Sequence, residues 1–383
     1  MKTFDRRIGL YIHIPFCKAK CYYCDFNSFA CKEDYIPPYF DALKKEIALY
    51  SSSLKDYSIK TVFIGGGTPS SVRNRYIYEI LNFCNQNFNI EKDAEISIET
   101  NPGTLSYEKL MAYRILGINR LSIGLQAWQN RLLKSLGRIH TNKEFEDNFE
   151  QARKAGFKNI NVDLIFGLPQ QTIKDWDETL SKVLELQPEH ISCYSLKIED
   201  NTAFGNMLEI GELIPAEDEL DREMYYLGIK RLNEAGFEHY EISNFSKPGY
   251  QCRHNMIYWE AEQYIGLGAG AHSYFLKKRY NNEGDIGEYI KVVTDHGLMP
   301  ADEQEIDAQE EIYEFIILGL RLTWGICTNE FKERFGKDIF QLFSTQINKL
   351  LNNRLIEIVE GHIRLSSKGL DLANEVFVEF MGE

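Results

Sequence analysis

The sequence predicts an α/β fold, an incomplete (β/α)6 barrel followed by a small, helical, winged-helix-like C-terminal domain. Short and almost continuously apolar runs alternate with amphipathic stretches over residues 1–240, which is typical of parallel strands covered by helices. Six such strand–helix units follow one another, and this number favours a partial barrel over a flat, doubly wound sheet. Helices followed by a short hairpin near the C-terminus predict the second domain.

The predicted barrel elements follow in chain order. Apolar runs predict the strands Gly9–Ile14, Lys60–Gly65, Glu95–Thr100, Arg120–Leu125, Asn159–Phe166 and His190–Ile198. Amphipathic spacing predicts the helices Pro38–Ser51, Ser70–Asn87, Tyr107–Leu116, Asn142–Ala155, Ile173–Leu186 and Glu217–Ala235. Gly117 and Gly156 follow two of these helices, where a left-handed residue commonly ends a helix.

The pattern changes beyond residue 240. Residues 241–300 are rich in glycine, histidine and aromatic residues and are predicted to be mainly loop. Residues 301–383 are predicted to form the winged-helix-like domain, with its elements at Ile306–Leu322, Asn329–Phe335, Ile339–Asn352, Leu355–Val359, His362–Leu365 and Ser367–Phe380. We therefore predict three parts, a barrel at 1–240, a loop-rich segment at 241–300 and a domain at 301–383.

Composition narrows the class of protein. Of the 383 residues, 44% are hydrophobic and 26% charged, and the formal net charge is −14. Such an acidic chain is not expected to bind nucleic acid, because phosphate recognition needs a cationic surface. No run of about 18 apolar residues predicts a membrane span, and the N-terminus lacks the apolar region of a signal peptide. We expect a cytoplasmic protein with reduced cysteines.

Three cysteines with the spacing C-x3-C-x2-C, Cys17, Cys21 and Cys24, directly follow the first predicted strand. Thiolates in a reducing compartment are ligands for zinc or for an iron–sulfur cluster. A structural zinc site takes four ligands, and Cys31 is available as a fourth. A [4Fe–4S] cluster also normally takes four, so three cysteines leave one iron free to bind the amino and carboxylate groups of S-adenosylmethionine (SAM). We favour the cluster.

Glycine and polar residues end the later predicted strands. Gly65-Gly-Gly-Thr-Pro69 ends the second strand, and adjacent glycines let the backbone approach a ligand. Later strand ends carry Glu99, Gln126 and Asp163, with Arg138 in the loop after Gln126. Each of these could be a helix cap or a solvated charge. In a barrel, however, successive strand ends meet at one face, where ligands bind, so we predict a site that suits an amino acid group such as that of SAM.

These motifs resemble a known family. The similar stretches are Tyr11-Ile-His-Ile-Pro-Phe-Cys17, Cys24-Asp-Phe26, Gly65-Gly-Gly-Thr-Pro69, Glu99-Thr-Asn-Pro102, Ser122-Ile-Gly-Leu-Gln126, Leu136-Gly-Arg-Ile-His140 and Asp163-Leu-Ile-Phe-Gly-Leu-Pro169. They resemble the oxygen-independent coproporphyrinogen III oxidase-like family of radical SAM proteins over nearly the whole chain. The resemblance implies a radical SAM barrel that holds a [4Fe–4S] cluster and SAM.

The resemblance also assigns roles to residues. It implies that SAM on the cluster contacts the residues Tyr11, Tyr23, Gly66 and Glu99. Further positions match those that hold a second SAM in the true oxidases, namely Gly67, Thr68, Gln126, Arg138 and Asp163. Whether one or two SAM molecules bind here stays open.

His254-Asn255-Met-Ile-Tyr258-Trp259 is similar to the His-Asn-x-x-Tyr-Trp motif of the haem chaperone branch of this family. Phe26, which stands where the oxidases have a further cysteine, favours the same branch by resemblance, as does the expected lack of their N-terminal extension. His254 could ligate haem iron, with Tyr258 and Trp259 packed on the porphyrin. The alternative is structural, with His254 hydrogen-bonded to backbone and the two aromatic rings in the core.

Several functions follow from these interpretations. The first is a haem chaperone that binds a [4Fe–4S] cluster, SAM and haem, and delivers haem to acceptor proteins without oxidase activity. The second is a coproporphyrinogen III oxidase, which performs SAM-dependent oxidative decarboxylation in porphyrin biosynthesis. The third is a radical SAM methyltransferase, and the fourth is a structural zinc protein. The sequence leaves open whether SAM is cleaved and whether the chain forms a homodimer.

Overall fold

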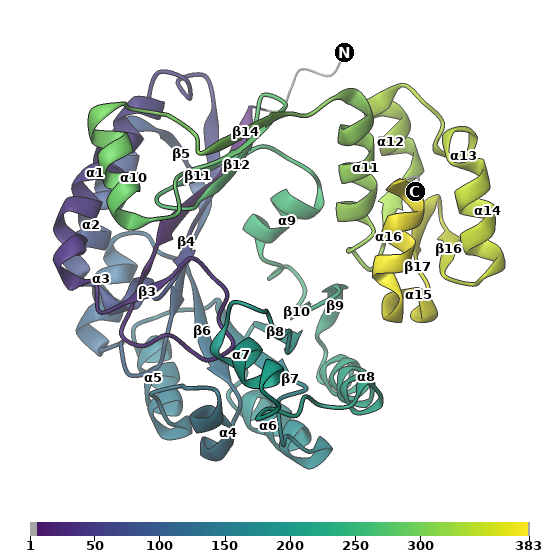
Figure 1. The fold of residues 1–383 in the computed structure, drawn as a ribbon, viewed down its shortest axis with the longest axis horizontal. Helices are drawn as coiled ribbons and strands as arrows, with labels where there is room; N and C mark the ends of the chain where they lie inside the picture. The colour runs from purple at the N-terminus through teal and green to yellow at the C-terminus, as the bar shows by residue number, and fades with distance from the viewer. Residues whose placement is uncertain (1–5, 382–383) are drawn as a thin grey trace.

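The computed structural model describes residues 6–381, and its largest unit is a curved, mostly parallel sheet (Figure 1). Six strands follow one another in parallel, as the alternation of apolar runs and helices predicts. These are β1 (Arg7–Ile14), β4 (Ser58–Gly66), β5 (Asn89–Thr100), β6 (Arg120–Gln126), β7 (Ile160–Phe166) and β8 (His190–Ser195).

Further strands extend both edges of this sheet. β11 (Tyr264–Leu267) pairs in parallel with β1, and β12 (His272–Phe275), β13 (Lys278–Asn281) and β14 (Asp302–Glu305) continue antiparallel from it. At the other edge, β10 (Asn244–Ser246) pairs with β8 and with β9 (Glu238–Glu241). The two outermost strands, β14 and β9, are not paired with each other, so the barrel is incomplete, as predicted.

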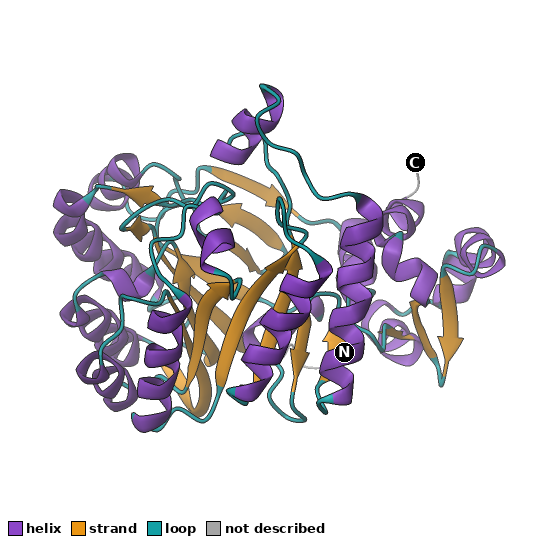
Figure 2. Cartoon of the chain, turned by 90° about the horizontal axis from the view of Figure 1, so that it is seen from below, coloured by secondary structure: helices purple, strands orange, loops and turns teal. Residues whose placement is uncertain are grey.

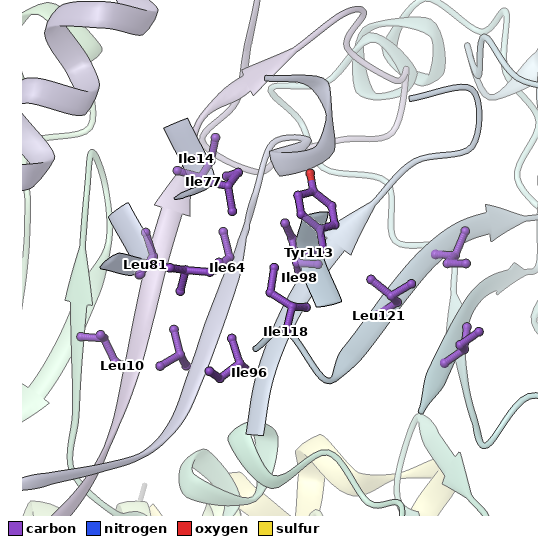
Figure 3. Packing of buried hydrophobic residues seen from close by; sticks show 14 of the residues in the cluster. Leu10, Ile14, Ile64, Ile77, Leu81, Ile96, Ile98, Tyr113, Ile118 and Leu121 are labelled. Atoms are coloured by element: carbon purple, nitrogen blue, oxygen red, sulfur yellow. The ribbon is translucent and has the colours of Figure 1, made fainter. Parts of the chain in front are cut away.

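Helices cover the outer face of the sheet, as Figure 1 shows. They are α1 (Ile36–Tyr50), α2 (Asn74–Asn87), α3 (Tyr107–Ile115), α5 (Asn142–Lys154), α6 (Ile173–Glu185), α8 (Asp218–Glu234) and α10 (Ile286–Asp295). The core lies between these layers: Ile64 of β4 and Ile98 of β5 pack near Ile77 of α2 and Tyr113 of α3 (Figure 3). Because apolar burial is the main stabilising term of folding, this layer fixes the strand ends relative to one another.

Residues 241–300 are more regular than predicted. Besides β10 to β13 they contain α9 (Arg253–Trp259) and α10. Their strands have only three or four residues each, too few to give a clear alternation of apolar and polar residues. Short helices also occur within the predicted loops at α4 (Asn130–Ser135) and α7 (Ala203–Glu209), with a single turn at Glu33–Tyr35. The helix predicted from Ser70 begins instead at Asn74, after a separate single turn at Pro69–Ser71.

The C-terminal domain lies beside the barrel and has its own hydrophobic core (Figure 2). Its helices are α11 (Ala308–Gly319), α12 (Thr328–Phe335), α13 (Ile339–Leu342), α14 (Ser344–Asn352), α15 (Ser367–Asp371) and α16 (Ala373–Met381). A small antiparallel sheet joins β15 (Ile326–Cys327), β17 (His362–Leu365) and β16 (Ile356–Val359). Two predicted helices are each interrupted, at Phe343 and at Leu372, where the backbone leaves the helical region.

In the part of the chain that the structure describes, no helix is both long and apolar enough to cross a lipid bilayer.

Candidate functional site

The cysteine loop begins where β1 ends. Two short strands, β2 (Phe16–Cys17) and β3 (Phe29–Ala30), pair in parallel and close the base of the loop that carries the three cysteines. The Lys20 ammonium donates to the carbonyls of Phe26 and Ser28, both at 3.1 Å. The loop is therefore a formed structure, with the cysteine side chains half-buried on it.

Asn27 ties this loop to the segment that follows β11. Its side-chain amide donates to the carbonyls of Ala269 at 3.0 Å and Gly284 at 2.9 Å, while its main-chain carbonyl accepts from His13 Nε2 at 2.7 Å. The neighbouring turn is held by Glu46 of α1, which is fully buried. Glu46 accepts from the Gly268 N–H at 2.8 Å, and also from Tyr289 and Asn282.

Polar side chains surround the three thiols. Cys17 lies 3.4 Å from the Thr68 hydroxyl, and Arg138 Nη1 lies 3.5 Å from Cys21 Sγ. Cys24 lies 3.7 Å from the Ser28 hydroxyl, and burial raises the pKa of the Cys24 thiol. Within residues 6–381, no three His, Cys, Asp or Glu side chains are grouped as one metal ion would need. Hydroxyl and guanidinium groups therefore lie within reach of all three thiols.

The glycine run packs tightly against β1. Gly66 has a φ of +110°, and a Cβ atom there would lie 2.5 Å from the His13 ring. At Gly67, a Cβ atom would lie 2.9 Å from the carbonyl oxygen of Phe16. These glycines are therefore required by the close approach of β4 to the start of the cysteine loop, and this approach leaves their backbone facing the cavity below the cysteines.

That cavity, the mouth cavity, lies at the carboxyl ends of the parallel strands and has a volume of about 370 Å³. The three cysteines line it together with Tyr23, Gly66, Gly67, Thr68, Glu99, Asn101, Gln126, Arg138, Asp163 and Tyr194. Glu99 accepts from the Gly66 N–H at 3.0 Å. Burial, followed by the nearby Asp163, raises the pKa of Glu99 to about 8, so this carboxyl can hold a proton at neutral pH.

Arg138 is fixed in the wall of the mouth cavity. Its Nη2 donates to Asn101 Oδ1 at 2.7 Å and to the Gly124 carbonyl at 2.5 Å. Its Nε is buried and has no hydrogen-bond partner in the structure. Gln126 lies beside it with a φ of +73°, at a register shift between β6 and β7. A non-glycine residue in the left-handed region is uncommon and is often found at functional sites.

An inner chamber of about 160 Å³ lies inside the barrel, below the mouth cavity. Glu99, Asp163 and Tyr194 line both spaces. The carboxylate of Asp163 accepts from Ser122 at 2.7 Å and from Asn161 at 2.8 Å. These donors hold Asp163 in one orientation between the two spaces.

His254 lies in the wall of the inner chamber and is only 1% exposed. Its Nδ1 pairs with the Thr61 hydroxyl at 2.7 Å and its Nε2 with the Tyr258 hydroxyl at 2.9 Å. Burial lowers the pKa of His254 to about 3, so the ring is neutral. Direct ligation of haem iron by His254 does not fit this conformation, because both ring nitrogens are occupied and the chamber is far smaller than a haem.

The structure thus divides the predicted site residues into groups. The mouth cavity brings together Cys17, Cys21, Cys24, Tyr23, Gly66, Gly67, Thr68, Glu99, Gln126, Arg138 and Asp163. The inner chamber holds Tyr11, His254, Asn255 and Tyr258. Trp259 lies in neither space: its ring packs under the guanidinium of Arg321, 4.5 Å away, and faces the C-terminal domain.

Sequence reasoning does not single out Asn101 or Asn27. Asn101 positions both Arg138 and Thr68, to which its amide donates at 2.9 Å. Its place in the Glu99–Pro102 stretch is the signal that could have identified it. Asn27 follows Phe26 by one position, but its partners lie 242 and 257 residues away along the chain, so no local pattern predicts its role.

The donor set fits a [4Fe–4S] cluster and SAM. Three thiols line one side of a cavity whose other walls offer glycine backbone, a carboxyl group and an arginine with an unpartnered buried Nε. Thiolates are the ligands of such clusters, and carboxylates and backbone groups bind the hydroxyl and amino groups of a nucleoside or amino acid. The volume of about 370 Å³ lies in the range of small-molecule sites.

Comparison with known proteins identifies the family. Residues 11–183 match the Radical SAM superfamily, and residues 306–372 match the HemN C-terminal domain. The chain is 39% identical over 374 residues to the heme chaperone HemW of Bacillus subtilis (strain 168), covering 97% of this chain and 99% of that protein. The chain belongs to the HemN-like family of radical SAM proteins, in its HemW branch.

Other relatives agree with this assignment. The heme chaperone HemW of Lactococcus lactis subsp. lactis (strain IL1403) is 36% identical over 372 residues, covering 97% of this chain and 96% of that protein. The solved coproporphyrinogen III oxidase HemN of Escherichia coli superposes with a TM-score of 0.87 at 23% identity, covering 98% of this chain and 90% of that one. The HemN likeness shows the radical SAM fold, and membership of the superfamily implies a [4Fe–4S] cluster and SAM.

Proposed function

We propose that this chain is a haem chaperone that holds a [4Fe–4S] cluster and SAM in the mouth cavity and delivers haem to acceptor proteins in the cytoplasm. The observation that carries the proposal is the 39% identity over 97% of the chain to a protein named heme chaperone. The mouth cavity supports the cofactor part, because it collects the cysteines and the polar strand ends at one face.

The chain's own residues would act as follows. Cys17, Cys21 and Cys24 would hold the cluster, which when bound supplies an open iron for SAM and an electron for its reduction. The Gly66 backbone and Glu99 would bind the amino group and the ribose of SAM. Arg138, held by Asn101 and Gly124, would place its positive charge beside a carboxylate of the ligand. The rim, including the exposed Phe26, would limit the access of water to the cluster.

Titration of anaerobically reconstituted full-length protein with haem tests the proposal. We expect saturable binding with a defined stoichiometry, and transfer of the bound haem to an apo-haemoprotein added in excess. Protein with its cluster in place that binds no haem saturably would contradict the proposal. Size-exclusion chromatography of the same sample would show whether haem or the cluster promotes a homodimer.

The second candidate is a coproporphyrinogen III oxidase. It is favoured by Gln126, Arg138 and Asp163, which line the mouth cavity at positions that by resemblance hold a second SAM in oxidases. Incubating the reconstituted protein with coproporphyrinogen III, SAM and a reductant distinguishes the two candidates. The chaperone proposal predicts no protoporphyrinogen, and turnover at a rate that depends on the cluster would favour the oxidase.

A further inference from the structure

Another hollow lies at the opposite end of the barrel strands from the mouth cavity. It has a volume of about 350 Å³ and is found where β1 and β4 begin, beside α9 and the turn that leads into β15. We call it the basal groove. Its lining includes Arg7, Lys60, Arg253, Met256, Glu260 and Trp324. Figure 1 shows α9 at this place, between the barrel strands and the C-terminal domain.

The other hollows of the barrel suit haem less well. In the proposed function the mouth cavity, about 370 Å³, already holds the cluster and SAM. The inner chamber, about 160 Å³, is below the range of about 300–1,000 Å³ that is usual for ligands of this class. A hollow of about 520 Å³ beside Phe26 has the acidic Asp25, Glu199 and Asp200 in its lining, which would repel the haem propionates.

The lining of the basal groove has the chemistry that haem requires. Met256 is half-buried, and a methionine thioether is an established class of haem iron ligand. Trp324 is 40% exposed, and an indole can stack on a porphyrin face. Lys60 and Arg253 line the groove together with one acidic residue, Glu260, so cationic groups are present for the propionates.

Arg253 is already oriented in the free protein. Its Nη1 donates to the Asp93 carbonyl at 2.6 Å while its side chain is exposed. A guanidinium fixed in this way can give two parallel N–H donors to a carboxylate. Lys60 is paired with Glu262, so its charge is partly used, and Arg253 is the stronger candidate for propionate recognition.

His254 lies directly behind the wall of the basal groove. Thr61 lines the groove, and its hydroxyl is the partner of His254 Nδ1 at 2.7 Å. The histidine therefore supports the wall without reaching the groove. This arrangement gives the His254–Trp259 motif a role in forming the haem site that needs no free ring nitrogen.

We propose that haem enters the basal groove by one edge, with Met256 facing the iron, Trp324 beside the porphyrin and Arg253 at a propionate. The proposal rests on the proposed chaperone function and adds to it the location and the ligand of the haem. The outer edge of the ring stays accessible to an acceptor, because the groove opens to solvent between exposed residues. Cluster and haem then occupy opposite ends of the barrel.

Haem titration of full-length variants tests this location. The variants are Met256→Leu, a nearly volume-conserving change that usually costs little stability, and Arg253→Gln. Met207→Leu is the matched control, because Met207 is also half-buried but belongs to α7 near Tyr23. Circular dichroism checks that each variant is folded, and the absorption spectrum of bound ferric haem reports the iron ligand.

We expect Met256→Leu to weaken haem binding about tenfold or more and to remove the thioether-to-iron absorption, while Met207→Leu changes neither. Arg253→Gln should weaken the binding of haem but not that of haem dimethyl ester, which has no propionate charge. If both groove variants keep the affinity and spectrum of the parent, the groove proposal is wrong and the chaperone function stands. The groove proposal would also be overturned if His254→Ala lost haem binding while Met256→Leu kept it in full. No saturable binding by the parent would remove the chaperone function itself.

Discussion

Glu46 makes the stability of this protein depend on pH near neutrality. The carboxyl group is fully buried between α1 and the turn after β11, and burial raises its pKa to about 7 from an ordinary value of 4.5. As pH rises from 4.5 to 7, the unfolded chain loses this proton before the folded chain does. The favourable contribution of the protonated form is therefore complete below pH 4.5 and is lost as pH rises through 7.

The size of the effect follows from the shift. A difference of 2.5 pKa units between 7 and 4.5 corresponds to about 3.4 kcal/mol lost over the whole range, at 1.36 kcal/mol per unit. By the linkage relation, about 1.4 kcal/mol of this stability is lost between pH 6 and pH 8.5. Such a change is a substantial part of the stability of an ordinary domain.

Urea denaturation at several pH values measures this change, followed by fluorescence and circular dichroism. Glu46→Gln removes the titration, so its stability relative to the parent should rise by about 1.4 kcal/mol between pH 6 and pH 8.5. Glu79→Gln, a change of a partly exposed carboxylate on α2 that pairs with Lys44, is the control, and its stability should change with pH as that of the parent does. If the stabilities of Glu46→Gln and the parent change in parallel over this range, Glu46 does not titrate there and the linkage argument fails.

Three further predictions concern the site. After anaerobic reconstitution, Cys17→Ser should lose iron and acid-labile sulfide, whereas Cys31→Ser, a change of an exposed cysteine, should retain both. One zinc per chain without sulfide in the parent protein would contradict the cluster. Gly66→Ala should lower the free energy of unfolding in urea by about 1–2 kcal/mol or more, because φ is +110° and the new Cβ would clash with the His13 ring. An unchanged urea midpoint would contradict this prediction. His254 has a pKa of about 3, so the stability that its neutral ring contributes should fall below pH 6.5, by about 2 kcal/mol at pH 5. His254→Gln should remove this loss. If the variant and the parent lose equal stability between pH 6.5 and pH 5, the argument is refuted.

The sequence predicts the parallel strands well because each is a buried apolar run. Ile12 of β1 and Val62 of β4 are fully buried, as expected for strands that are covered on both faces. β11 could not be predicted in the same way. It has four residues, Tyr264–Leu267, and it exists as a strand because β1 offers it an unpaired edge. Such tertiary pairing leaves little trace in local sequence.

The strand order predicts which residues gather at the mouth cavity, but it does not predict how deep in the barrel each side chain lies. Glu99 and Asp163 end neighbouring parallel strands, so the sequence alone places them at one face. Tyr11 also lies on the inner face of its strand, but three positions before the strand ends, and it lines the inner chamber. Glu46 could have been noticed, because it falls on the helical stripe of Leu43 and Tyr50 that packs into the core.

The long-range tie of Asn27 has a consequence for the order of events during synthesis. The cysteine loop emerges from the ribosome early, but the carbonyls that anchor it lie 242 and 257 residues later in the chain. At about 5–20 residues per second, this interval lasts roughly 12–50 s. Over the same interval, the edge of β1 that later pairs with β11 stays unpaired. An unpaired strand edge can associate with other chains. The cysteine loop therefore gains its final support only when most of the protein has been made, so a loop fully held for ligand binding is available only late in synthesis.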